Sequence, residues 1–253
     1  MGLDLQKAGV FKRLSALLCD FVAFIVLLLG LSLLFSTVFG YDAYNQTVID
    51  AYAAYEEKYN IDFNITQEQY DKLPDETKKL YTEANREMNA DYDIVKAYAM
   101  REALPLLIIS LGILLTSIIL EFVVPLIFKN GQTLGKKLFG ICVVRTNCVK
   151  ITGPVLFIRS ILGKCTMETM VPVFIVIMIL SGKLGIVGFA VLALILLLQI
   201  VMIIITHTNS AIHDLLADTV VVDLGSQRIF ENQDELIAYK KKVHEEAVKG
   251  SKY

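Results

Sequence analysis

Two charged side chains, Arg13 and Asp20, lie in an otherwise apolar run over residues 11–39. Seven residues advance a helix by about 10 Å and turn it through nearly two full circles, so both charges fall on one face. A carboxylate at the centre of a membrane helix costs about 2.5–3.5 kcal/mol, and somewhat less near the interface. Asp20 therefore needs a partner elsewhere in the protein, and the chemistry that it offers is ion or proton binding.

Other carboxylates occur at similar depths. Glu121 lies about eight residues before Lys129, which ends the second apolar run, and Glu168 lies near the start of the third. At 1.5 Å per residue, Asp20 and Glu121 both sit about 10–12 Å inside the same boundary. Carboxylates at one depth repel, so one of them should hold a proton and release it as a cation arrives. Asp20, Glu121 and Glu168 are therefore the candidate ion-binding and proton-binding residues.

A structural interpretation competes with this one. Salt bridges between Arg13 and Asp20, and between Lys164 and Glu168, would fix the register of the helices without binding a ligand. We favour this interpretation for Arg13, Asp20 and Asp214, because an arginine already supplies the counter-charge. For Glu121, which has no basic residue within one helical turn, the two interpretations carry equal weight.

The elements that position these residues are membrane spans. The chain has 253 residues, 55% of them hydrophobic, and a mean hydropathy of +0.57, with the apolar residues concentrated in long runs. Such runs are typical of an all-α polytopic membrane protein. We expect four transmembrane helices, at 14–39, 103–128, 166–180 and 184–205. The third is short for a full crossing, so a re-entrant segment is the alternative.

Loop charge orients these spans. Residues 129–164 carry seven basic residues and no acidic one, whereas residues 40–102 carry 14 acidic and seven basic ones. We therefore expect both termini in the cytoplasm of a bacterial cell, with the protein in its plasma membrane. The domain organisation that follows is 1–39, 40–102, 103–128, 129–165, 166–206 and 207–253. A net charge of −2 offers no general attraction for nucleic acid.

The outer segment, residues 40–102, is predicted to be a helical hairpin. Tyrosines from Tyr41 to Tyr59 recur every three or four residues, which is typical of one packed helix face. Thr66 followed by Gln69 predicts a capping box at the start of the next helix. Pro74 is then expected in the first turn of a helix that leads towards the second span.

The basic segment between spans two and three is predicted to be partly β-structured. Alternating β-formers over 141–152 suggest a β-hairpin, to which residues 219–223 would add a third strand. Residues 154–164 are expected to form a separate amphipathic helix at headgroup level. The residues predicted to contact lipid headgroups are Lys136, Lys137, Arg159 and Lys164.

Three motifs together resemble the RDD family of membrane proteins. They are FKR followed by Asp20 at the start of the first span, GQTLGKKLFGICVVR at 131–145, and HDLLADTVVV at 213–222. The family is named for an arginine and two aspartates, which by this resemblance are Arg13, Asp20 and Asp214. The segment 40–102 looks like an insertion, and Asp218 stands where the closing motif usually has glycine.

The resemblance implies a transport role, and sodium–proton exchange has been proposed for some members. Our first hypothesis is therefore a small transporter that exchanges a sodium ion or another small cation for a proton, acting as a homo-oligomer because four helices enclose little space. The alternative is a membrane adaptor or scaffold that binds partner proteins through its soluble segments. Neither hypothesis involves an enzyme or a cofactor. No metal site is predicted, since His207 and His213 are six residues apart and His213 is better explained as a hydrogen-bonded interfacial residue.

Overall fold

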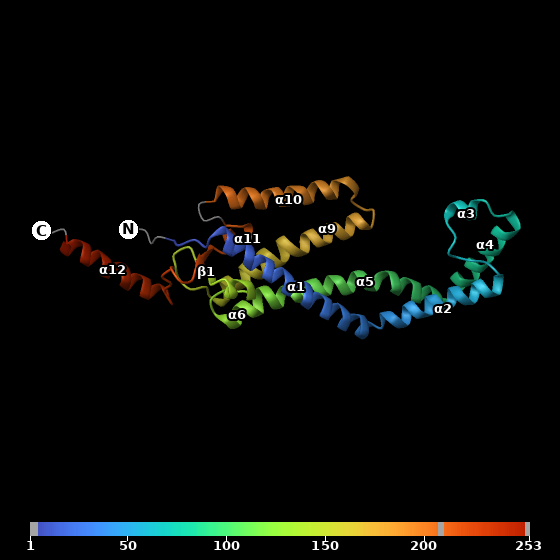
Figure 1. Cartoon of the computed structure of the whole chain (residues 1–253), viewed down its shortest axis with the longest axis horizontal. Helices are drawn as coiled ribbons and strands as arrows, with labels where there is room; N and C mark the ends of the chain where they lie inside the picture. The colour runs from blue at the N-terminus through green and yellow to red at the C-terminus, as the bar shows by residue number, and fades with distance from the viewer. Residues whose placement is uncertain (1–4, 207–209, 251–253) are drawn as a thin grey trace. The chain divides into compact units, whose positions relative to one another are not determined.

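The computed structural model describes residues 5–206 and 210–250, so His207 lies outside the described residues. The chain divides into two compact units, and each is described by itself. The first unit comprises residues 1–28 and 113–253, and the second comprises residues 29–112. The elements in chain order are α1 (Val10–Phe39), α2 (Tyr41–Tyr59), α3 (Gln67–Asp71), α4 (Asp75–Ala90), α5 (Tyr92–Ile118), η1 (Ile119–Val123), α6 (Val124–Phe128), α7 (Leu134–Leu138), β1 (Ile141–Arg145), α8 (Gly153–Phe157), η2 (Ile158–Met170), α9 (Val171–Leu180), α10 (Gly185–Ile205), α11 (Ile212–Leu216), β2 (Thr219–Asp223) and α12 (Gln233–Gly250) (Figure 1).

Four helical stretches of the described chain are long and apolar enough to cross a membrane: Val10–Phe39, Tyr92–Phe128, Gly153–Leu180 and Gly185–Ile205. The four predicted spans are thus confirmed. The third begins earlier than expected, because the segment predicted to form a separate interfacial helix continues into it without a break. Its 28 residues are enough for a full crossing.

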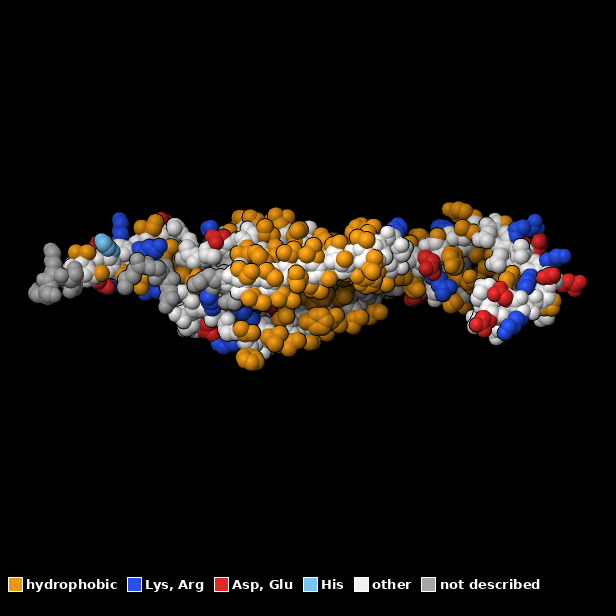
Figure 2. Space-filling model, turned by 90° about the horizontal axis from the view of Figure 1, so that it is seen from above, with side chains coloured by type: hydrophobic (Ala, Val, Ile, Leu, Met, Phe, Trp, Pro, Cys, Tyr) orange, Lys and Arg blue, Asp and Glu red, His pale blue; other side chains and the backbone are white. Residues whose placement is uncertain are grey.

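The spans expose apolar side chains that would be unfavourable in water. Ile186 and Ile204 of α10 are 84% and 71% exposed, and Figure 2 shows hydrophobic side chains covering a broad surface over this part of the chain. Contiguous apolar surface of this kind belongs in lipid. The chain is therefore an integral membrane protein.

Two spans contain π-helical segments, in which backbone hydrogen bonds join residues five apart. The second span is π-helical at η1, around Glu121, and the third is π-helical over the 13 residues of η2. In η2, the hydroxyls of Thr166 and Thr169 donate to the carbonyls of Ile161 and Lys164, each five residues earlier, at 2.8 and 3.1 Å. Residues five apart in η2 therefore lie on the same face.

The glycines near the turn between α9 and α10 serve that turn and the packing beside it. Gly182 and Gly185 have φ of +70° and +48°, which favours glycine. A Cβ on Gly188 would lie 2.5 Å from Cγ1 of Ile179, so this glycine lets α10 pack closely on α9.

The sheet of the first unit differs from the predicted hairpin. β1 pairs with β2 in antiparallel register, with Val143 opposite Val221, and residues 149–151 are joined to the sheet only by isolated bridges such as Val144 to Lys150. Both faces of the pair are covered: Val143 and Val221 lie in one buried cluster, and Val144 and Val220 in another. Burial on both faces favours continuous runs of valine and isoleucine over alternation.

The second unit is the predicted helical hairpin. Its core is aromatic: Tyr55 and Tyr59 of α2 pack with Phe63, Tyr70 and Tyr81, so these two tyrosines of the stripe serve packing. The capping box at α3 is also confirmed. Thr66 accepts a hydrogen bond from the Gln69 backbone at 3.3 Å, and Gln69 accepts one from the Thr66 backbone at 2.8 Å.

Candidate functional site

A cavity of about 460 Å³ in the first unit collects ionisable side chains from α1, α7, η2 and α11. Gln199 and Ile203 of α10 and apolar residues of α1 such as Leu14 and Leu17 complete its wall. The ionisable residues on the wall are Arg13, Asp20, Lys136, Arg159, Lys164, Glu168, His213 and Asp214. Together with Glu121, which pairs with Lys164, they are called the ionic cluster below. Asp20 and Glu168 of the three candidate carboxylates line this cavity, whereas Glu121 does not.

Asp20 is held by the start of α7. One carboxylate oxygen accepts from the hydroxyl of Thr133 at 2.5 Å, and the other accepts from the backbone N–H of Gly135 at 2.7 Å. Charge-assisted hydrogen bonds at a helix N-terminus are favourable for a carboxylate. A Cβ on Gly135 would lie 2.1 Å from the carbonyl oxygen of Ala16, so only glycine lets α7 approach α1 closely enough.

Arg159 and Asp214 form the most buried ion pair of the cluster. The Nε and Nη2 atoms of Arg159 donate to Oδ1 of Asp214 at 2.9 and 2.8 Å, and the two side chains are 3% and 5% exposed. The Thr219 hydroxyl donates to the same oxygen at 3.2 Å. This pair ties the third span to α11, just before β2.

Lys164 of η2 pairs with Glu121 of η1. The two charged groups thus join the π-helical segments of two neighbouring spans. The second oxygen of Glu121 is buried and has no hydrogen-bond partner among the described residues. Glu121 is not among the residues that line the cavity.

Glu168 and His213 form a carboxylate–imidazole pair. Nδ1 of His213 lies 2.8 Å from both oxygens of Glu168, and the His213 backbone N–H donates to Oε1 at 3.1 Å. The other ring nitrogen, Nε2, faces Oδ2 of Asp214 at 3.6 Å. A Cβ on Gly163 would lie 2.7 Å from Cβ of His213, so α11 rests directly on this glycine. Gly163 and Glu168 are five residues apart in η2, and the π-helical spacing turns both of them towards His213.

Three groups of the ionic cluster that lie outside the spans have shifted pKa values. Burial and then Arg159 lower the pKa of His213, against the opposing effect of Glu168. Burial alone would raise the pKa of Asp214, but Arg159 and His213 outweigh it and hold that pKa below its usual range. Burial, with Arg159 and Lys164, lowers the pKa of Lys136 to about 8.

The predicted partners were wrong, although the residues were brought together. Arg13 does not pair with Asp20 in the described contacts: its Nη2 donates to the carbonyl of Val221 at 2.7 Å, while Asp20 binds α7. Glu168 meets His213 rather than Lys164, and Glu121 has the basic partner that it was expected to lack. Each of these partners comes from a segment distant in sequence, so spacing along the chain gave no sign of it.

The four predicted headgroup residues occupy different environments. Arg159 is 2% exposed and committed to Asp214, so its predicted contact with lipid phosphate was wrong. Lys164 is paired with Glu121, and Lys136 lines the cavity. Lys137 is exposed, with its ammonium 3.8 Å from the centre of the Phe128 ring, and its headgroup contact stays a prediction.

Some residues of the site were not singled out from the sequence. Thr133 and Gly135 hold Asp20, and Gly163 admits His213. Gln199 lines the cavity, and its position as the one strongly polar residue of the last apolar run is a signal that could have identified it. The glycines carried no such signal, because a close approach between distant segments is not visible in sequence.

Four apolar helical stretches, three of which line an ionisable cavity, define a multi-span membrane protein. The model of the RDD family matches residues 7–218, so the chain belongs to the RDD family. No curated protein and no solved structure matches the chain. Arg13, Asp20 and Asp214, which by motif resemblance correspond to the arginine and aspartates of the family's name, all line the cavity.

The structure explains how Asp218 can stand where the family's closing motif usually has glycine. This residue has φ of +51°, in the left-handed region that glycine adopts most easily and aspartate tolerates. The hydroxyl of Thr146 donates to its Oδ1 at 2.6 Å, and the Thr146 backbone N–H donates to its carbonyl at 3.2 Å. The turn before β2 is therefore preserved, and a side-chain hydrogen bond offsets the strain.

Proposed function

We propose that this protein exchanges a small cation such as sodium for a proton across the plasma membrane, with Glu168 and His213 as the exchanging pair. The basic character of residues 129–152 and the acidic character of residues 40–91 support an orientation with both termini in the cytoplasm. The ionic cluster then faces the cytoplasmic side.

The observation that carries this proposal is the imidazole of His213, whose two ring nitrogens face the carboxylates of Glu168 and Asp214 within the ionic cluster. Among the described residues, four basic side chains stand beside four carboxylates, and a proton on His213 adds one positive charge to this set. The cationic residues are Arg13, Lys136, Arg159 and Lys164, and the acidic ones are Asp20, Glu121, Glu168 and Asp214.

A proton on His213 and a cation at Glu168 exclude each other. Two like charges about 5 Å apart at an effective dielectric constant of about 20 repel by about 3 kcal/mol, which corresponds to a factor of more than one hundred. The proton is taken up at Nε2, opposite Asp214, and the resulting imidazolium binds the Glu168 carboxylate through Nδ1. When that proton leaves, the carboxylate can accept a cation instead. Mutual exclusion of this kind is what an exchanger requires.

Glu168 is a better exchange site than the other carboxylates because its partner is an imidazole, which can be either neutral or charged. Asp214 is bound by an arginine, and Glu121 by a lysine. Asp20 is committed to two hydrogen bonds that hold α7 in place. Glu168, with its histidine partner, can change its counter-charge.

Flux of sodium and protons in proteoliposomes tests the proposal. The proteins to compare are wild type and the variants Glu168→Gln and His213→Gln. Glu246→Gln, on the exposed surface of α12, is the matched control. We expect Glu168→Gln to reduce exchange by about tenfold or more, because it removes a charged partner. His213→Gln should retain sodium binding but uncouple it from protons, and the control should behave as wild type.

The same measurements can contradict the proposal. Flux that is unchanged in Glu168→Gln would exclude this carboxylate as the exchange site. If Glu121→Gln alone abolished flux, the site would instead lie at the Lys164 pair. No flux in any variant, including wild type, would leave the adaptor hypothesis, in which the soluble segments bind partner proteins.

A further inference from the structure

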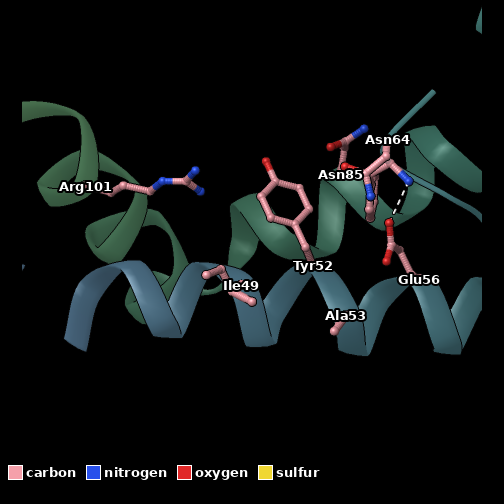
Figure 3. Close-up of a pocket in the computed structure, with 8 residues that line it drawn as sticks. Ile49, Tyr52, Ala53, Glu56, Asn64, Asn85 and Arg101 are labelled. Atoms are coloured by element: carbon pink, nitrogen blue, oxygen red, sulfur yellow. Dashed lines mark hydrogen bonds between the residues drawn. The ribbon is translucent and has the colours of Figure 1, made fainter. Parts of the chain in front are cut away.

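A groove of about 490 Å³ in the second unit is separate from the ionic cluster. Its lining comes from α2, the loop after α2, α4 and the start of α5: Ile49, Tyr52, Ala53, Glu56, Phe63, Asn64, Asn85 and Arg101. Figure 3 shows the guanidinium of Arg101 towards the Ile49 end of α2 and the carboxylate of Glu56 beyond Tyr52. The groove therefore has a cation at one end and an anion at the other.

Polar groups of the groove have unused hydrogen-bonding capacity. Within the described part of the chain, the guanidinium of Arg101 has no hydrogen-bond or ion-pair partner, and neither has the hydroxyl of Tyr52. Glu56 accepts the Phe63 backbone N–H at 2.8 Å through one oxygen, which leaves its second oxygen available. Asn85 donates its amide to the carbonyl of Tyr81 at 2.9 Å, which leaves its amide oxygen available.

The floor of the groove is rigid. The ring of Tyr52 packs edge-on against Phe63, with centroids 5.2 Å apart, and Phe63 packs against the buried Tyr81 at 5.8 Å. The hydroxyl of Tyr81 donates to the carbonyl of Asp62 at 2.8 Å and so fixes the loop that carries Phe63 and Asn64. Polar groups held on such a floor lose little freedom when they bind a ligand.

We propose that this groove binds a small zwitterion, with an oxyanion on Arg101 and an ammonium group on Glu56. Arginine is suited to this role because its planar fork matches a carboxylate or phosphate. Ile49 and Glu56 are seven residues apart, or about 10 Å along α2. A hydrogen bond of about 3 Å at each end leaves about 4–5 Å between the two charges of the ligand, which suits a small zwitterion such as a dipeptide.

A ligand with both an ammonium group and an oxyanion can come from solution or from the membrane. A free dipeptide carries an ammonium and a carboxylate, and the headgroup of phosphatidylethanolamine carries an ammonium and a phosphate. In the membrane case phosphatidylcholine is a discriminating ligand, because its quaternary ammonium has no N–H to donate to Glu56.

Titration of the purified full-length protein with alanyl-alanine tests the soluble ligand. The analogues are N-acetylated and C-amidated alanyl-alanine, each of which lacks one charge. We expect saturable binding of alanyl-alanine, and binding about tenfold or more weaker for either analogue. Native mass spectrometry of the protein in nanodiscs tests whether the ligand is a lipid. It counts the phosphatidylethanolamine or phosphatidylcholine molecules that stay bound to the protein.

Variants assign the binding to the groove. Arg101→Gln and Glu56→Gln should each weaken binding of the ligand that wild type binds by about tenfold or more. Glutamine at position 56 still offers an oxygen that accepts the Phe63 backbone N–H. The matched controls are Arg86→Gln and Glu57→Gln, which lie outside the groove. Wild-type helicity by circular dichroism verifies that each variant is folded.

Three results would overturn the inference: neither ligand binds, the groove variants bind as tightly as wild type, or Arg101 alone matters, in which case the ligand is a simple anion. None of these results depends on cation exchange, since the groove shares no residue with the ionic cluster.

Discussion

At the scale of single residues, the buried pair between Arg159 and Asp214 is the firmest contact of the ionic cluster. Removing one partner of such a pair leaves an uncompensated charge and costs about 3–5 kcal/mol, whereas replacing both with apolar residues is often neutral. The cost of a change therefore depends on what remains of the pair.

We expect Arg159→Met to lower the stability of the protein in detergent by about 3–5 kcal/mol. The double variant Arg159→Met with Asp214→Leu should recover much of that loss, although Thr219 loses an acceptor. Thermal unfolding followed by circular dichroism measures both. If the double variant were less stable than Arg159→Met alone, the two residues would not be each other's main partners.

His213 gives the protein a dependence on pH. Its pKa is lowered by burial and by Arg159, so the unfolded chain, with a pKa of about 6.5, binds the proton more readily than the folded one. Stability is therefore greatest above about pH 6.5 and falls as the pH drops from there towards the lowered pKa of the folded state. Glu168 and Asp214 face the ring and limit the size of this effect.

Thermal unfolding at several pH values between about 7.5 and 5.5 checks this expectation, with a slope of up to about 1.4 kcal/mol per pH unit for one proton. His213→Gln should flatten the slope, and His244→Gln on the exposed face of α12 should leave it as in wild type. A rise in stability on acidification would mean that the folded protein prefers the imidazolium.

At the scale of elements, η2 decides which side chains of the third span meet. An α-helical period would separate Gly163 from Glu168 around the helix, but the five-residue spacing of a π-helix turns both towards α11. The backbone geometry thus creates the contact between His213 and Glu168.

Gly163→Ala should disturb this contact, because the new Cβ would lie 2.7 Å from Cβ and 2.8 Å from Cα of His213. We expect a loss of about 1–3 kcal/mol from overpacking, and a change in the pH dependence described above. Gly30→Ala is the matched control, since no atom lies within 4 Å of its Cβ, and alanine there should be neutral or stabilising by up to about 1 kcal/mol. Equal stability of the two variants would mean that α11 can move away at no cost.

Local elements were predictable from the sequence, and contacts between distant ones were not. The four spans and the capping box of Thr66 and Gln69 follow from hydropathy and from residue types three positions apart. The pairing of β1 with β2, across more than 70 residues, and the contact of Asp20 with α7 depend on tertiary packing. The π-helical segments were missed for a related reason, since sequence periodicity assumes 3.6 residues per turn.

At the scale of the whole molecule, the arrangement of charges predicts a topology. Lys79 lies in the acidic segment expected outside, and Lys241 lies in α12, expected in the cytoplasm. Both side chains are exposed, whereas three of the four native cysteines are buried.

A membrane-impermeant thiol reagent tests this topology in intact cells. We expect Lys79→Cys to be labelled without permeabilisation and Lys241→Cys to be labelled only after it. Wild type provides the background from Cys19 and the buried thiols. Labelling of Lys241→Cys in intact cells would invert the orientation and place the ionic cluster on the outer side.

The segment before the first span is joined to β2, which follows the last span. The Ala8 backbone N–H donates to the carbonyl of Val221 at 3.2 Å, the Asp223 N–H donates to the carbonyl of Gln6 at 3.0 Å, and Lys12 pairs with Asp223. During synthesis on the ribosome, the first helix must therefore wait in the bilayer until more than 200 further residues have been translated before its entry segment can dock. Nascent chains released before that point would keep these amides and apolar residues open to chaperones and proteases, which makes late stop codons a route to degradation of an otherwise inserted protein.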